Sequence, residues 1–301
     1  MTLLVSNQIE EKVAEGRLTS AAAARFRAFV DRCNSELMTH AVITDNRYCR
    51  WFARGEATRD DVTHLLVQFS VFSNLFLVAQ LLKTINAGSL EGMRASKEIL
   101  ANEIGVIFNK PGATLGEVKD KDREGDPEIV AVEGTVDGGT FRFRAAHFEW
   151  LLRMGQVLGL GFNDMGKRRH GTPATVFFCD QLAEIYGSAD PNVAEGASFA
   201  VENWAAAGFW KQLIAGLESF KAREEPGLPL AFFTWHDRIE EQHADHVMDE
   251  LEDVYFTDDF DEEKFLQGGR EMLDGVAAFW NGLNEHRIAA RHRQASRAGE
   301  G

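Results

Sequence analysis

Apolar residues recur at steps of three and four along most of this chain, and this spacing restricts its fold more than any other feature. Residues three and four positions apart lie on one face of an α-helix, so each such segment predicts a helix with one buried face. We therefore expect an all-α fold, a bundle of about eight helices. The segments that carry the spacing are 20–38, 58–84, 89–108, 144–158, 173–187, 194–221, 229–255 and 261–285.

Two segments depart from this helical pattern. From about 110 to 144 a charged stretch is followed by alternating residues around Asp137 and Gly138, a dipeptide typical of two-residue hairpin turns. We expect a small β-hairpin here, inserted into the bundle. Residues 287–301 are polar and basic and end the chain, so we expect a disordered tail. The prediction is a single helical domain over 1–286.

Charge and cysteine content narrow the classes of function. The 301 residues carry a net charge of -15, which repels phosphate backbones and anionic lipid, so we expect neither nucleic acid nor membrane as a partner. The most apolar window, 65–82, is interrupted by polar residues and predicts a core helix rather than a membrane span. The three cysteines are widely scattered, which suits reduced thiols in the cytoplasm, and the start of the chain predicts no secretory signal.

The predicted helix over 229–255 places ionisable residues where its buried face should be apolar. Its apolar stripe is Phe232, Phe233, Val247, Leu251 and Val254. The middle of that stripe is occupied by His236, Glu240 and His243, which fall within roughly 60° of one another on a helix. Burying an unpaired charge costs several kcal/mol, so these side chains need partners in the core.

Three other predicted helices each carry one ionisable residue within an apolar stripe. These are Glu103, His147 and Glu202, which complete a set of three glutamates and three histidines from four helices. Carboxylate and imidazole in this proportion are typical ligands of iron or manganese, and Glu-x-x-His, here Glu240 and His243, is the step used in di-iron carboxylate bundles. The alternative interpretation is a buried network of salt bridges and hydrogen bonds without metal.

The order and spacing of the six residues resemble the haem-oxygenase-like diiron oxidases and oxygenases, whose helical fold is shared with thiaminase II and the cofactor-less quinone-forming oxidase. That family has a Glu, a His, a Glu about 55 residues later, and then His/Asp-x-x-x-Asp-x-x-His. The matching residues here are Glu103, His147, Glu202, His236, Glu240 and His243. The run NRYCRWFARGEATRDDVTHLLVQFSVFSNLF is also similar to the family's opening helices.

The resemblance implies two iron ions, or a manganese and an iron ion, that use O2 to oxidise a small molecule. The reactions of the family are N-oxygenation, oxidative C–C cleavage and desaturation, mostly in specialised metabolite or natural product biosynthesis. It implies that Glu202 bridges the two metals, that Glu103 and His147 serve one of them, and that His236, Glu240 and His243 serve mainly the other. We also expect a homodimer and an external electron donor.

The sequence departs from the family pattern at two points. Glu240 stands where the family usually has Asp, one methylene shorter. The family's further carboxylate before the His has no clear counterpart, and the inserted hairpin, through Asp137 or Glu133, is one source for it. Two functions of other classes stay open: a metal-free enzyme of the thiaminase or quinone-oxidase type, and a non-catalytic metal-binding or interaction protein.

Overall fold

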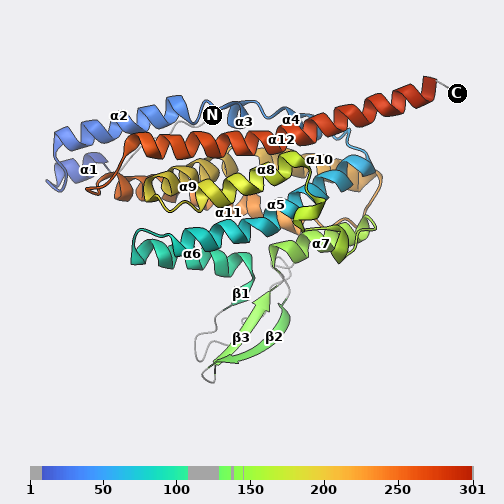
Figure 1. The fold of residues 1–301 in the computed structure, drawn as a ribbon, viewed down its shortest axis with the longest axis horizontal. Helices are drawn as coiled ribbons and strands as arrows, with labels where there is room; N and C mark the ends of the chain where they lie inside the picture. Colours follow the sequence, from blue (N-terminus) through green and yellow to red (C-terminus); the bar gives the residue numbers. More distant parts are fainter. Residues whose placement is uncertain (1–8, 108–128, 137–138, 145, 300–301) are drawn as a thin grey trace.

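The structure is a computed structural model that describes residues 9–107, 129–136, 139–144 and 146–299. Within these ranges the side chains at 91, 102, 107, 129–136, 139–144, 239–247, 249–250, 294 and 297–299 lie outside the description. The described chain is a bundle of α-helices from which a small β-sheet projects (Figure 1). This is the all-α architecture that the apolar spacing predicts.

Most of the helices follow one another with short connections, and the longest connection joins α6 to α7. In chain order they are α1 (Ile9–Ala14), α2 (Ser20–Glu36), α3 (Ala41–Thr44), α4 (Arg47–Phe52), α5 (Arg59–Ile85), α6 (Leu90–Glu103), α7 (His147–Val157), α8 (Pro173–Gln181), α9 (Pro191–Ala205), α10 (Phe209–Arg223), α11 (Ala231–Tyr255) and α12 (Glu262–Gly299). Two 3-10 turns, η2 (Phe162–Asp164) and η3 (Arg168–His170), precede α8, and a π-helical turn, η4 (Leu182–Tyr186), follows it directly.

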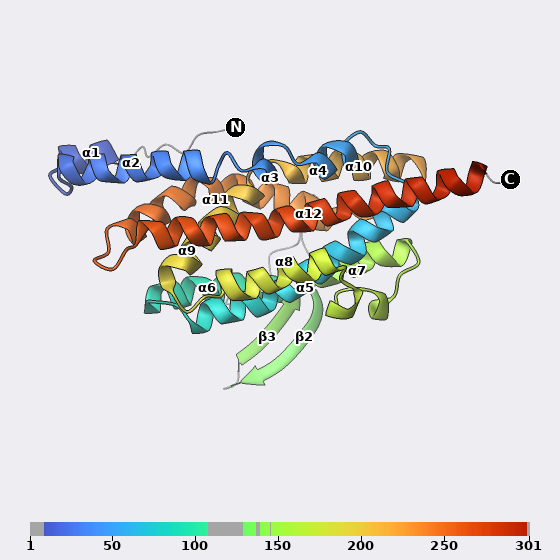
Figure 2. The same cartoon turned by 45° about the horizontal axis from the view of Figure 1, so that its top comes forward.

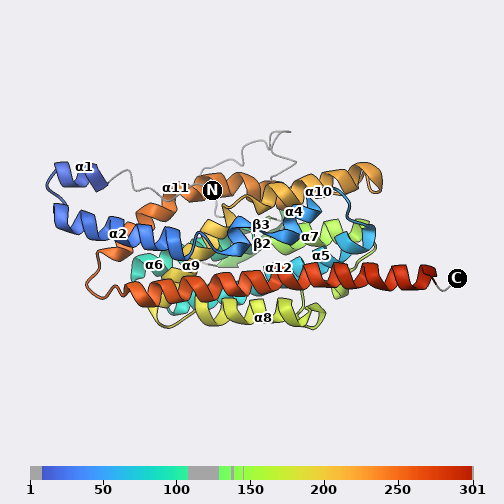
Figure 3. The same ribbon diagram turned by 90° about the horizontal axis from the view of Figure 1, so that it is seen from above.

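Helix α12 runs the length of the molecule and packs along α9 and α8 (Figures 2 and 3). Its contact with α9 depends on glycine, because the two backbones approach too closely for a side chain. A Cβ atom at Gly196 would lie 1.9 Å from the carbonyl oxygen of Phe265, and one at Gly268 would lie 2.2 Å from that of Val193. These two glycines fix the distance between the helices.

Helix α5 is the second long element of the core. It begins with a capping box, in which the Thr58 hydroxyl accepts from the backbone N–H of Asp61 and the Asp61 carboxylate accepts from that of Thr58. By length and composition it could cross a membrane, but half of its most apolar window is buried in the bundle, as the prediction of a core helix requires. Phe69, near its centre, contacts aromatic rings from α10, α11 and α12.

The sheet is inserted between α6 and α7 and projects from the side of the bundle (Figures 1 and 2). Strands β2 (Ile129–Val136) and β3 (Gly139–Arg144) pair antiparallel on either side of positions 137–138, which lie outside the described residues. A short strand that the sequence did not predict, β1 (Val106–Ile107), pairs with the other edge of β3. The strand order β1-β3-β2 ties the end of α6 to the start of α7.

Three helix boundaries differ from the sequence-based expectation. The predicted helix 89–108 ends at Glu103, because Gly105 adopts a positive φ of 73° that stops a right-handed helix. The predicted helix 194–221 is divided into α9 and α10 by Gly208, with φ 91°. The expected disordered tail over 287–301 is wrong for the described part, since α12 continues to Gly299.

Two features explain why this polar C-terminal segment forms a helix. Alanine and arginine, which dominate its sequence, are strong helix formers. The guanidinium groups of Arg287 and Arg291 also lie 4.2 Å and 5.1 Å from the centre of the Trp51 ring, which holds the first turns of this segment against α4. Beyond these contacts the helix extends past the bundle (Figure 3).

Candidate metal centre

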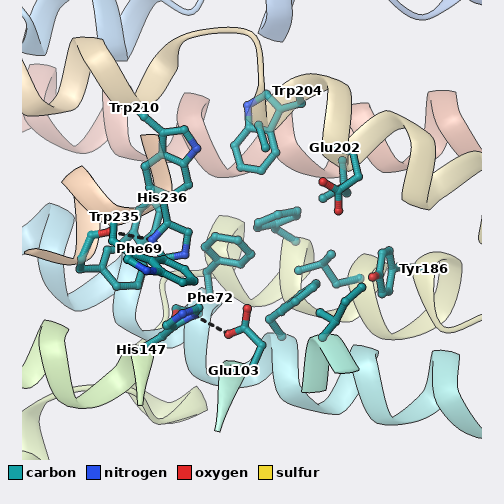
Figure 4. A pocket seen from close by; sticks show the side chains of 18 residues that line it. Phe69, Phe72, Glu103, His147, Tyr186, Glu202, Trp204, Trp210, Trp235 and His236 are labelled. Carbon is teal, nitrogen blue, oxygen red and sulfur yellow. Dashed lines mark hydrogen bonds and ion pairs between the residues drawn. The ribbon is translucent and has the colours of Figure 1, made fainter. Parts of the chain in front are cut away.

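A cavity of about 360 Å³ lies inside the bundle, lined from α5, α6, α7, α8, η4, α9, α10 and α11. Its described wall is largely aromatic and contains five ionisable side chains. The aromatic residues are Phe69, Phe72, Phe76, Phe178, Tyr186, Trp204, Trp210, Phe232 and Trp235, and the ionisable ones are Glu103, His147, Glu202, His236 and Tyr186. Four of the six residues singled out in the sequence therefore line one cavity (Figure 4).

Glu103 and His147 form a direct pair at one side of this cavity. The Nδ1 atom of His147 lies 2.8 Å from Oε2 of Glu103, and the two side chains are only 7% and 15% exposed respectively. A ring nitrogen this close to a carboxylate oxygen carries the proton, so in the neutral imidazole the lone pair is on Nε2. A carboxylate that orients a histidine in this way is a common arrangement beside bound metals.

The two residues stand at adjoining helix ends. Glu103 is the last residue of α6, and His147 is the first residue of α7. The end of one helix and the start of the next therefore bring a carboxylate and an imidazole together at the cavity wall.

His236 on α11 approaches His147 from the opposite helix. The ring centres lie 4.7 Å apart at an angle of 64°, and the other face of His236 stacks on Trp210 at 4.7 Å. Its Nδ1 atom lies 2.6 Å from the carbonyl oxygen of Phe232, one turn earlier on the helix. Because a carbonyl only accepts, Nδ1 carries the proton, and the lone pair of the neutral ring is again on Nε2.

Glu202 on α9 lies across the cavity from Glu103 (Figure 4). It also borders a smaller cavity of about 20 Å³, whose wall includes Leu251 and Val254 of α11. The apolar stripe of α11 therefore faces α9 and Glu202. Helix α11 is continuous from Ala231 to Tyr255.

Glu240 and His243 are the other two of the six predicted residues. The side chains of Glu240 and His243 lie outside the described residues, as do Asp137 and the side chain of Glu133. Among the side chains that the structure describes, no three His, Cys, Asp or Glu residues are close enough to hold a metal ion. The four described candidates do supply the donor types that iron and manganese prefer, two carboxylates and two imidazoles with defined tautomers.

Tyr186 is a residue of the cavity that sequence reasoning missed. Its hydroxyl donates to Oε1 of Gln80 at 2.8 Å, and Nε2 of Gln80 donates to Oγ of Ser96 on α6 at 2.7 Å. Burial, and then the nearby carboxylate of Glu202, raise the pKa of the Tyr186 hydroxyl well above its usual value, so it stays a neutral donor. Nothing in the sequence indicates the π-helical turn that directs this ring into the cavity.

Comparison with known proteins identifies the fold. No protein-family model matches the sequence, and no curated protein matches it. A CADD-like protein of unknown function from Nostoc punctiforme PCC 73102 is 15% identical, with a TM-score of 0.56 over 89% of this chain and 97% of that one. A domain of unknown function with a heme oxygenase-like fold from Shewanella denitrificans OS217 is 14% identical, with a TM-score of 0.55 over 96% of each chain. The chain has the haem-oxygenase-like helical fold that the resemblance implied.

Proposed function

We propose that this protein is a non-haem dinuclear-iron enzyme that uses O2 to oxidise a small molecule. The observation that carries the proposal is the convergence of Glu103, His147, Glu202 and His236 on one cavity from four different helices. These residues were singled out by their positions in apolar stripes and by their order along the chain.

In this proposal the six residues hold the metal ions. Glu103 and His147 serve one ion, His236 with Glu240 and His243 serves mainly the other, and Glu202 bridges them. A pair of ferrous ions supplies electrons to O2, which no protein side chain does. A manganese and an iron ion would suit the same donor set.

The described residues of the chain contribute orientation and exclusion of water. The carboxylate of Glu103 and the carbonyl of Phe232 fix the tautomers of the two histidines, and Trp210 holds the ring plane of His236. The aromatic wall keeps the cavity apolar, which limits side reactions of a reactive oxidant with water. Tyr186 is held by Gln80 and offers a neutral hydroxyl at the cavity wall.

Several parts of the proposal go beyond the site itself. The substrate is a small molecule of natural product biosynthesis, the reaction is N-oxygenation, oxidative C–C cleavage or desaturation, and an external donor returns electrons. The enzyme acts in the cytoplasm. It is a homodimer, and analytical ultracentrifugation tests this oligomeric state directly. These parts rest on the resemblance and on composition.

A metal-free enzyme with a thiol nucleophile fits the structure less well. Cys33, Cys49 and Cys179 are all buried, and none of them lines the described wall of the cavity. Burial raises the pKa of Cys33 and of Cys179 to about 12, so neither forms a thiolate near neutral pH.

The test is metal analysis after anaerobic incubation with Fe(II) and removal of unbound metal. We expect up to two iron ions per chain and a transient visible absorption when O2 is admitted. His236→Ala should lower the iron content, whereas His292→Ala, at an exposed position of α12, should not. Wild-type protein that retains no stoichiometric iron or manganese would return the site to a salt-bridge network without metal.

A further inference from the structure

The described wall of the cavity carries acidic side chains but no lysine or arginine. Among the described side chains that line it, Glu103 and Glu202 are acidic, and none is a lysine or an arginine. Lys83 is not among the described lining residues: it donates to Ser198 at 2.6 Å and lies over the Tyr186 ring, 4.8 Å from the ring centre. The wall therefore offers no described cationic side chain to an anionic substituent.

Several hydrogen-bonding atoms of the wall are already engaged. Tyr186 donates to Gln80, Nδ1 of His147 faces Glu103, and Nδ1 of His236 faces the Phe232 carbonyl. By contrast, the indole Nε1 atoms of Trp204 and Trp210 are buried without a hydrogen-bond partner, so an uncharged polar substituent has two neutral donors in the wall. Apolar contact is what the rest of the wall provides.

The shape and chemistry of the wall favour aromatic groups. Three indole rings, those of Trp204, Trp210 and Trp235, line the cavity together with Phe72 and Phe178, whose centres are 4.9 Å apart. Such rings bind flat apolar groups by offset and edge-to-face contacts and bind cations on their faces. At about 360 Å³ the cavity is near the small end of ligand pockets, which span about 300–1,000 Å³.

We propose that the cavity takes a small aromatic molecule that is uncharged or cationic and discriminates against an anionic one. Transfer of a carboxylate from water into the metal-free wall would leave it beside two glutamates, with no lysine or arginine among the described lining residues to pair it. An ammonium group would instead face two carboxylates and several ring faces. The claim that this molecule is the substrate rests on the proposed function. The claim that the cavity binds it does not.

The experiment compares three compounds that share a phenyl ring and differ in charge: 2-phenylethanol, 2-phenylethylamine and 3-phenylpropanoate. Binding is followed by tryptophan fluorescence with excitation at 295 nm, where the phenyl ring does not absorb, in metal-free protein. We expect the alcohol and the amine to bind at least about tenfold more tightly than the carboxylate, a difference of about 1.4 kcal/mol.

Matched variants locate the binding. Ala205 lines the cavity, and its neighbour Ala206 is exposed, so Ala205→Phe should abolish binding and Ala206→Phe should leave it unchanged. Val201→Phe, at a less buried position of the wall, serves if Ala205→Phe does not fold. Circular dichroism should be unchanged in each folded variant.

Two results would overturn the inference: carboxylate binding as tight as that of the alcohol in the metal-free protein, or unchanged binding in folded Ala205→Phe and Val201→Phe proteins. Failure of the proposed function is distinct, because it would appear as absent iron while the metal-free protein still bound the alcohol. Selective binding in the metal-free protein therefore tests the wall alone.

Discussion

The Nδ1 atom of His147 lies 2.8 Å from Oε2 of Glu103, although the two residues are 44 positions apart. The inserted sheet explains how this distance is kept. Strand β1 follows α6, strand β3 precedes α7, and the pairs Val106–Phe143 and Ile107–Arg142 hold the two strands side by side. The β1–β3 ladder thus closes the long insertion at its base and places the end of α6 beside the start of α7.

The two glutamates on opposite sides of the cavity should differ in their effect on metal content. If Glu202 bridges both ions, Glu202→Ala should abolish binding of both, whereas Glu103→Ala should spare one. Glu195→Ala is the control, because Glu195 lies on the same helix but pairs with Lys83 at 3.8 Å outside the main cavity. Iron per chain is measured after anaerobic incubation, and equal loss in the Glu202 and Glu103 variants would argue against the bridging role.

Glu240 should couple metal binding to the stability of α11. A ligand carboxylate is ionised beside the cation, and without metal it is a buried charge compensated mainly by His236 and His243. Fe(II) should therefore raise the melting temperature and increase amide-exchange protection near 232–250. Glu240→Gln should reduce the metal-dependent shift and raise the stability of the metal-free protein.

Thermal melting of both proteins with and without Fe(II) measures these effects. An unchanged metal-induced shift in Glu240→Gln would make Glu240 a bystander. The second carboxylate would then have to come from the inserted hairpin, and Asp137→Asn and Glu133→Gln would be the next variants to melt.

The stacked pair His64 and His286 should make stability depend on pH. The ring centres lie 3.5 Å apart at 14°, and Nε2 of His64 is buried without a hydrogen-bond partner. Burial, and then the neighbouring His286, lower the pKa of His64 from 6.5 to about 4. Between these values the unfolded chain binds a proton that the folded chain does not, so stability should fall as the pH drops from about 6.5 to about 4 and level off below.

Melting temperature measured from pH 7.5 to pH 4.5 tests this expectation. His64→Phe keeps a planar ring without a titrating group, so its curve should be flatter than that of the wild type between pH 6.5 and pH 4.5. His292→Phe, at an exposed position, should follow the wild type. Parallel curves for wild type and His64→Phe would show that His64 does not contribute.

Gly196 should not tolerate even a methyl group. The Cβ atom of alanine would lie 1.9 Å from the carbonyl oxygen of Phe265, so α9 and α12 would have to separate. We expect Gly196→Ala to lower the free energy of unfolding by about 1–3 kcal/mol. Gly227→Ala, where a Cβ would meet nothing within 4 Å, should change it by less than about 0.5 kcal/mol. Urea denaturation measures both, and equal values would mean that the α9–α12 crossing adjusts at little cost.

The sequence by itself determined the helical architecture and the candidates of the site. Apolar spacing is a local property, so it predicts both the buried face of a helix and any ionisable residue on that face, such as His236 within the stripe of α11. It misplaced Glu103 in mid-helix, because a single glycine, Gly105, ends α6 through its backbone conformation. It also missed the helix of the C-terminal segment, which Trp51 on α4 holds through Arg287 and Arg291.

Only the tertiary structure decided which of these residues meet. The pairing of Glu103 with His147 depends on the β1–β3 ladder, and the contact of His147 with His236 depends on how α7 packs beside α11. The position of Tyr186 depends on a π-helical turn and on Gln80, more than 100 residues away. Contacts between distant segments are set by close packing and by hydrogen bonds of buried groups. These interactions leave no repeating pattern in the sequence, so apolar spacing does not predict them.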